Sequence, residues 1–198
     1  LTGFVLFLNS SVLANENRPW QLTKAVNFPE LISITGEHRT RYEFLNNQFR
    51  SGSVGSDQIL SLRTLVQTDL RFSKTFRVRL ELQDARAELA DAGSRINSSI
   101  VNSAELLEAN LVWEVKNLFS EGSQSTLRGG RLTIDIGKRR FIARNRFLNV
   151  IQAFTGIDWE WIAKNKTPFS SLLTMPVNHE PSAVADLLDN ASSVDEDT

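Results

Sequence analysis

The stretch ISITGEHRTRYEF, residues 32–44, decides the fold because its polar and apolar residues alternate without a break. One side of an extended chain would carry Ile32, Ile34, Gly36, His38, Thr40, Tyr42 and Phe44, and the other side Ser33, Thr35, Glu37, Arg39, Arg41 and Glu43. A helix would mix these two sets around its circumference, whereas a strand separates them. The stretch is therefore predicted to be a strand with one polar and one largely apolar face.

The same alternation recurs along the chain, which predicts an all-β, antiparallel architecture built from hairpins. The further predicted strands are residues 60–72, 76–83, 104–115, 131–139 and 154–162, with a weaker one at 169–177. Long connections at 45–59, 84–103 and 141–153 alternate with short ones at 73–75 and 163–168, and residues 117–130 are intermediate. Residues 141–154 also fit a short amphipathic helix.

The polar face of these strands carries arginine in close company with glutamate and aspartate. Residues two apart on one face of a strand lie about 7 Å apart, and guanidinium groups can bridge neighbouring carboxylates across that spacing. This composition predicts the wall of a wide aqueous lumen. The predicted lining residues are Arg39, Arg41, Arg63, Arg71, Arg77, Arg79, Arg131 and Arg139, with Glu37, Glu43, Asp69, Glu81, Asp158 and Glu160.

Apart from His38 and Tyr42, the opposite face carries no ionisable side chain. A charge at the midplane of a bilayer would cost about 2–4 kcal/mol, so this face is predicted to contact lipid. In the strands at 104–115 and 131–139 the residues assigned to it are Leu107, Ala109, Leu111, Trp113, Val115, Leu132, Ile134 and Ile136.

Aromatic side chains lie near the predicted strand ends, where a transmembrane barrel has interfacial girdles. They are Tyr42, Phe44, Phe72, Phe76, Trp113, Trp159 and Trp161. The alternative is an aromatic core in a soluble β-protein. Because the other face carries paired charges, the pattern favours an antiparallel transmembrane β-barrel.

Six or seven strands cannot close a bacterial barrel, which needs an even number from eight upward, and an open edge in lipid would leave backbone groups unpaired. The chain is therefore expected to be the N-terminal part of a larger barrel. Residues 1–14 fit the remnant of a signal peptide or, alternatively, a short strand. Residues 15–30 are expected to be a periplasmic lead or small plug, 31–177 the barrel strands, and 178–198 a truncated, acidic extracellular loop.

Other chemistry finds little support in the 198 residues. The net charge of −1 gives no indication of nucleic-acid binding, and the absence of cysteine excludes disulfides and thiolate sites. The two histidines suggest neither a catalytic triad nor a metal site. The acidic residues of the loops could hold Ca²⁺, but no twelve-residue loop has the spacing of calcium ligands. Asp158 and Glu160 could form a glycosidase pair, but two acids on a lumen wall are more often partners of arginine. No enzymatic activity and no cofactor are expected.

Four segments in order resemble the alginate-export family of outer-membrane porins: residues 39–43 (RTRYE), 79–86 (RLELQDAR), 105–111 (ELLEANL) and 130–140 (GRLTIDIGKRR). The resemblance covers roughly residues 31–177. It implies a monomeric barrel of about 16–18 strands in the bacterial outer membrane, through which a polyuronate passes outward. Its lining would include Arg39, Arg41, Arg79, Arg131 and Arg139, and its partners the bilayer, an anionic polysaccharide or solute, and periplasmic export proteins.

Glu108, Glu114 and Asp135 fall on the same predicted face, which then carries nine acids against eight arginines. Because this face has no surplus of positive charge, selectivity for a polyanion would depend on local clusters, on loops or on residues elsewhere. Three functions remain open at this point. They are a polysaccharide export channel, an uptake porin for small anionic solutes, and a soluble periplasmic β-rich binding protein.

Overall fold

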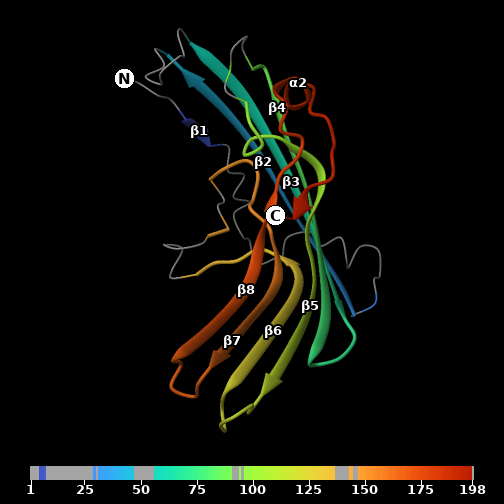
Figure 1. Cartoon of the computed structure of the whole chain (residues 1–198), viewed down its shortest axis with the longest axis vertical. Coiled ribbons are helices and arrows are strands. Elements are labelled where there is room, and N and C mark those ends of the chain that lie inside the picture. Colours follow the sequence, from blue (N-terminus) through green and yellow to red (C-terminus); the bar gives the residue numbers. More distant parts are fainter. Residues whose placement is uncertain are drawn as a thin grey trace, which may run out of the picture.

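The computed structural model describes residues 5–7 (backbone only), 29, 31–46, 56–90, 94, 96–136, 143–144 and 147–197. Its strands form one antiparallel sheet in which each pairs with the next along the chain (Figure 1). They are β1 (Val5–Phe7), β2 (Ile32–Leu45), β3 (Asp57–Arg71), β4 (Phe76–Glu88), β5 (Asn102–Lys116), β6 (Gln124–Leu132), β7 (Phe154–Ile162), β8 (Pro168–Asn178) and β9 (Glu196–Asp197). The all-β antiparallel prediction is confirmed, with β2 to β8 as the long strands. Among the described residues the sheet does not close into a barrel.

The connections are short at one end of the sheet and long at the other (Figure 1). The short turns are residues 72–75, 117–123 and 163–167, and the long connections are 46–56, 89–101 and 133–153. The intermediate connection expected at 117–130 is wrong, because its second half belongs to β6. The alternation of short and long connections is therefore more regular than the sequence predicted.

The strand predicted at 131–139 is displaced, because β6 occupies Gln124–Leu132 and residues 133–135 lie outside any strand. Residues 137–139 of the predicted strand lie outside the described residues. Leu132, Ile134 and Ile136 alternate with polar residues, but the first two are almost fully buried and so do not face outward. The true strand contains Gly129 and Gly130 and has little apolar character, which conceals it from a search for alternation.

A β-bulge in β5 reverses the predicted faces of two leucines. Glu108 lies opposite Glu81 and Leu106 lies opposite Leu82, so Leu107 is an extra residue in the ladder. Leu107 is 1% exposed and points to the polar side of the sheet, whereas Leu106 is 37% exposed on the other side. The assignment of Leu107 to the lipid face is therefore wrong.

The two faces of the sheet differ in what covers them. We call the face with Arg63, Glu81 and Asp158 the inner face, and its opposite the outer face. The described residues between β6 and β7, which are 133–136, 143–144 and 147–153, are hereafter called the inner segment. They pack against the inner face through an apolar cluster of Leu65, Leu107, Ile151, Ala153 and Val177. Near the long connections a second cluster joins Leu187 of α2 (Val184–Leu188) to Ile59, Ala87, Ile96 and Val101.

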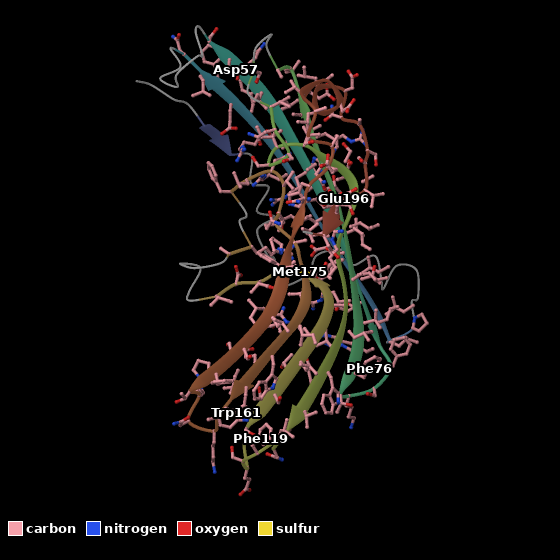
Figure 2. The ribbon with its side chains drawn as sticks, in the orientation of Figure 1. Asp57, Phe76, Phe119, Trp161, Met175 and Glu196 are labelled. Carbon is pink, nitrogen blue, oxygen red and sulfur yellow. The ribbon has the colours of Figure 1, made fainter. Side chains whose placement is uncertain are left out.

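The outer face exposes apolar side chains along the strands. They include Leu80, Leu82, Leu111, Trp113, Leu127, Ile157, Leu173 and Met175. Phe76, Phe119 and Trp161 lie toward the end with the short turns, far from Asp57 (Figure 2). Trp159 makes edge contacts with Phe119 and Phe169 at this end. This apolar band lies on the face predicted to contact lipid, and that contact stays a prediction. Because β4 extends beyond the predicted strand, the outer face also carries the ion pair of Asp84 and Arg86 toward the long connections.

Three further predictions concern residues 1–30, 141–154 and 178–198. Residues 5–7 form β1 against β2, with Val5 opposite Glu43, and apart from Pro29 the rest of 1–30 lies outside the described residues. The described residues 147–153 are not helical, although other parts of the suggested helix at 141–154 lie outside the described residues. The stretch 178–197 is more ordered than the expected loop, because it contains α2 and β9. In the described part of the chain, no helix has the length and apolar character needed to cross a membrane.

Candidate functional site

A cavity of about 600 Å³ lies on the inner face between the sheet and the inner segment. Its charged lining consists of Arg63, Arg79, Arg128 and Arg144 with Glu37, Glu81, Glu108, Asp135, Asp158 and Glu160. Eight of these were assigned to the polar face from the sequence: Arg63, Arg79, Glu37, Glu81, Glu108, Asp135, Asp158 and Glu160. The lining therefore carries both signs of charge, with more carboxylates than guanidinium groups.

Ion pairs between neighbouring strands form a ladder on the inner face. Arg79 Nε donates to Asp69 Oδ1 at 2.9 Å, and Arg128 Nε donates to Asp158 Oδ2 at 2.8 Å. In both pairs the two residues lie directly opposite each other across the sheet. Since opposed residues on one face lie about 4.5–5.5 Å apart, antiparallel pairing brings each guanidinium within reach of its carboxylate.

The inner segment contributes its own guanidinium to this ladder. Arg144 donates to both carboxylate oxygens of Glu81, at 2.6 and 2.8 Å, and its Nη1 lies 3.4 Å from Glu108 Oε1. Glu108 also accepts hydrogen bonds from the amide and hydroxyl of Thr133. Burial lowers the pKa of Arg144, but the hydrogen bond and charge of Glu81 outweigh it and raise that pKa above its ordinary value. Arg144 is therefore a permanent cation between two acidic strands.

Three predicted lining arginines hold the inner segment in place. Arg39 donates to the carbonyl oxygen of Leu148 at 2.9 Å, Arg63 donates to the same carbonyl at 3.1 Å, and Arg41 donates to that of Phe147 at 2.6 Å. The Arg41 guanidinium also lies over the Phe147 ring, 5.0 Å from its centroid. Arg39 and Arg41 thus lie on the predicted face but bind the inner segment and do not line the cavity. Arg63 does both.

Asn149 fastens the same segment to the sheet. Its side-chain amide nitrogen lies 3.0, 3.2 and 2.8 Å from the carbonyl oxygens of Leu62, Arg86 and Ile100. Two residues later, the Ile151 amide donates to Gln83 Oε1 at 3.0 Å. These contacts bind the segment to β3, β4 and the connection that follows β4.

The other predicted lining residues that the structure describes do not line the cavity. Arg77 pairs with Glu114 near the short turns at 2.9 Å, and Glu43 pairs with Arg41 at 3.2 Å. Arg71 is exposed at the end of β3. Arg131 pairs with Glu105 and Asp195, and Arg139 lies outside the described residues. The cavity therefore covers part of the predicted face, and the role of this face as the lining of a channel stays a prediction.

Arg128 and Arg144 are cavity residues that the predicted set lacks. Arg128 lies in the part of β6 that the sequence placed in a connection, and Arg144 lies in a segment without strand periodicity. Only a search for cations able to balance Glu81 and Glu108 would have pointed to Arg144.

A buried carboxylate outside the strands ties the C-terminal stretch to the sheet. Asp195 accepts hydrogen bonds from Asn102 at 2.8 Å and from the Glu180 amide at 2.9 Å, and it pairs with Arg131 and His179 at 2.8 Å each. Burial raises the pKa of Asp195, but the hydrogen bonds from His179 and Glu180 outweigh it and hold that pKa below its ordinary value. The carboxylate is therefore held in its charged form.

Within the described ranges, no group of histidine and acidic side chains is arranged to hold a metal ion. The expectation that the protein needs no metal or other cofactor stays a prediction.

A family model described as alginate export matches residues 30–194. The chain matches no curated protein and no solved structure. The matched range includes strands β2 to β8 and every side chain that lines the cavity.

Proposed function

The chain belongs to the alginate-export family, and we propose that it forms part of the wall of an outer-membrane channel for an anionic polysaccharide of the alginate type or a related anionic solute. The observation that carries this proposal is the contrast between the two faces of one sheet. The inner face holds an arginine–carboxylate ladder around a cavity, while the outer face exposes leucine, isoleucine and tryptophan. A wall between water and acyl chains needs this contrast.

The ladder suits an anionic sugar polymer for a physical reason. Guanidinium groups bind carboxylates through paired, charge-assisted hydrogen bonds. Here Arg79 and Arg128 already have carboxylate partners, Asp69 and Asp158. A passing uronate must compete with those partners, so each contact is weak and brief. Conduction requires binding that is favourable enough for entry and weak enough for exit.

The test is planar-bilayer conductance of the full-length protein with an oligouronate added to one side. We expect the oligomer to block the current, and the substitutions Arg79→Gln and Arg128→Gln together to weaken the block about tenfold, or about 1.4 kcal/mol. The matched control is Arg86→Gln, which removes an outer-face arginine paired with Asp84. A block of equal strength in the double variant and the control would count against the polysaccharide.

A second candidate is an uptake porin for small solutes, and the charge balance of the cavity favours it. The lining has no positive surplus that would concentrate a polyanion. This function requires small-ion conductance that the oligouronate does not block. The third candidate, a soluble binding protein, would have to remain dispersed without detergent despite exposing Leu82, Leu111 and Leu173. A monomeric barrel and periplasmic export partners are further expectations from the family.

A further inference from the structure

The inner segment is anchored at several points along its length. Arg144 binds Glu81, Asn149 binds three backbone carbonyls, and the Ile151 amide binds Gln83. Asn149, Ile151, Glu81 and Gln83 are almost fully buried. Since breaking these bonds would leave buried polar groups unsatisfied, the anchors resist detachment.

Apolar packing adds to these polar anchors. Ile151 and Ala153 are fully buried against Leu65, Leu107 and Val177. Loops that open and close tend to have few buried apolar contacts and solvent-exposed hydrogen bonds. Ile151 and Ala153 have the opposite character, which favours a fixed position for this part of the inner segment.

Arg144 has a particular place in this arrangement. Glu81 and Glu108 lie directly opposite each other on β4 and β5, and each side chain is 4% exposed. Like charges directly opposite on neighbouring strands repel each other. Arg144 lies within ion-pair distance of both carboxylates. Without it, the cavity lining would keep three arginines against six carboxylates.

We propose that the inner segment is a fixed constriction of the channel and that Arg144 is a specificity-determining residue, which sets the ion preference of the pore by masking Glu81 and Glu108. This inference rests on the proposed function as a channel. With Arg144 in place the constriction admits an anionic sugar chain. Without it, two unmasked carboxylates would repel that chain and favour cations.

The experiment measures the reversal potential of the full-length protein in planar bilayers under a potassium chloride gradient. Arg144→Gln should shift the permeability ratio toward potassium, and Glu81→Gln with Glu108→Gln should shift it toward chloride, each by about twofold or more. The triple variant should lie between these two. Arg86→Gln is the control, because it removes a guanidinium from the outer face and should leave the ratio unchanged.

The outcomes separate this inference from the function on which it rests. A protein that forms no channel contradicts the proposed function. A channel whose permeability ratio is the same in wild type, Arg144→Gln and the Glu81/Glu108 double variant overturns the role of Arg144. Should Arg144→Gln fail to assemble, the double variant alone decides.

A second measurement tests whether the segment is fixed. In a background without other cysteines, Ile151→Cys should react with a water-borne thiol reagent at least about 100 times more slowly than Ser170→Cys, because exposure controls thiol reactivity. Ile151 is fully buried, whereas Ser170 is exposed and also lines the cavity. Equal labelling rates in conducting channels would show that the segment leaves the wall, and would overturn the fixed constriction.

Discussion

Arg128 on β6 lies directly opposite Asp158 on β7, and its Nε donates to the aspartate carboxylate at 2.8 Å. The two side chains differ in exposure, at 29% for the arginine and 7% for the aspartate. Loss of the arginine therefore leaves a nearly buried carboxylate without this partner. Loss of both charges leaves two neutral side chains that can still hydrogen bond.

The first prediction concerns this pair. Arg128→Gln should lower the free energy of unfolding by about 1–3 kcal/mol, because it leaves the nearly buried Asp158 carboxylate without its cationic partner. Adding Asp158→Asn should recover part of that loss. Urea unfolding of the full-length protein in detergent measures both, in a double-mutant cycle. Additive losses in the cycle would show that the two side chains do not interact.

The second prediction compares adjacent glycines in β6. Gly130 has a φ of +123°, and a Cβ there would lie 2.4 Å from the Ala109 carbonyl oxygen, whereas a Cβ on Gly129 would meet nothing within 4 Å. Gly130→Ala should destabilise the protein by about 1–3 kcal/mol, and Gly129→Ala should have little effect. Unfolding midpoints of the two variants check this. Similar midpoints would contradict the conformation of Gly130.

The third prediction tests the bulge in β5. A fluorophore on Leu106→Cys should be quenched by lipids that carry a spin label, and a fluorophore on Leu107→Cys should not, because only Leu106 points to the outer face. Leu107→Ala should also cost about 2–5 kcal/mol, as expected for a leucine truncated in an apolar cluster. Quenching of the Leu107 label and protection of the Leu106 label would mean that Leu107 faces lipid, as the sequence predicted, and would contradict the bulge.

The fourth prediction is a pH dependence at Asp195. Because its pKa in the folded protein is lowered from 3.8, its contribution is complete above that value and is lost as the pH falls through the folded pKa. Amide hydrogen exchange in residues 179–197, corrected for the intrinsic rate, should therefore accelerate below about pH 4. Asp195→Asn should exchange faster at neutral pH and lose this dependence. The same acid response in that variant would assign the effect to another group.

Strand periodicity predicted most of the fold, and the failures have physical causes. Residues 154–162 form β7 with the predicted bounds, because Ile157, Trp159 and Trp161 alternate with acids. β6 was missed because the Gly129–Gly130 pair offers no alternation. Leu132, the last residue of β6, and Ile134 do alternate with polar residues, but both side chains are buried. The bulge was missed because an extra residue in a ladder leaves no mark in a single sequence.

The site was predicted in outline only. Period-two alternation correctly placed Arg63, Arg79, Glu81 and Asp158 on one face, since the side of a strand follows from residue parity. It could not show that Arg39 and Arg41 clamp the inner segment, or that Arg144 enters the ladder from it. Those contacts join residues about a hundred and about sixty positions apart, and no local pattern encodes them.

The extra residue Leu107 also determines what the deletion of one residue from β5 would do to the faces of the strand. In a regular strand such as β3, losing one residue would turn every side chain beyond it to the opposite face. At Leu107 the ladder already skips one residue, so a deletion there would make the pairing regular from Glu105 to Glu108, while the second register shift, between Gln83 and Ala85, would remain. A one-residue deletion at this point of β5 would therefore keep both ionised side chains on the inner face, whereas the same deletion within β3 would turn charged residues outward.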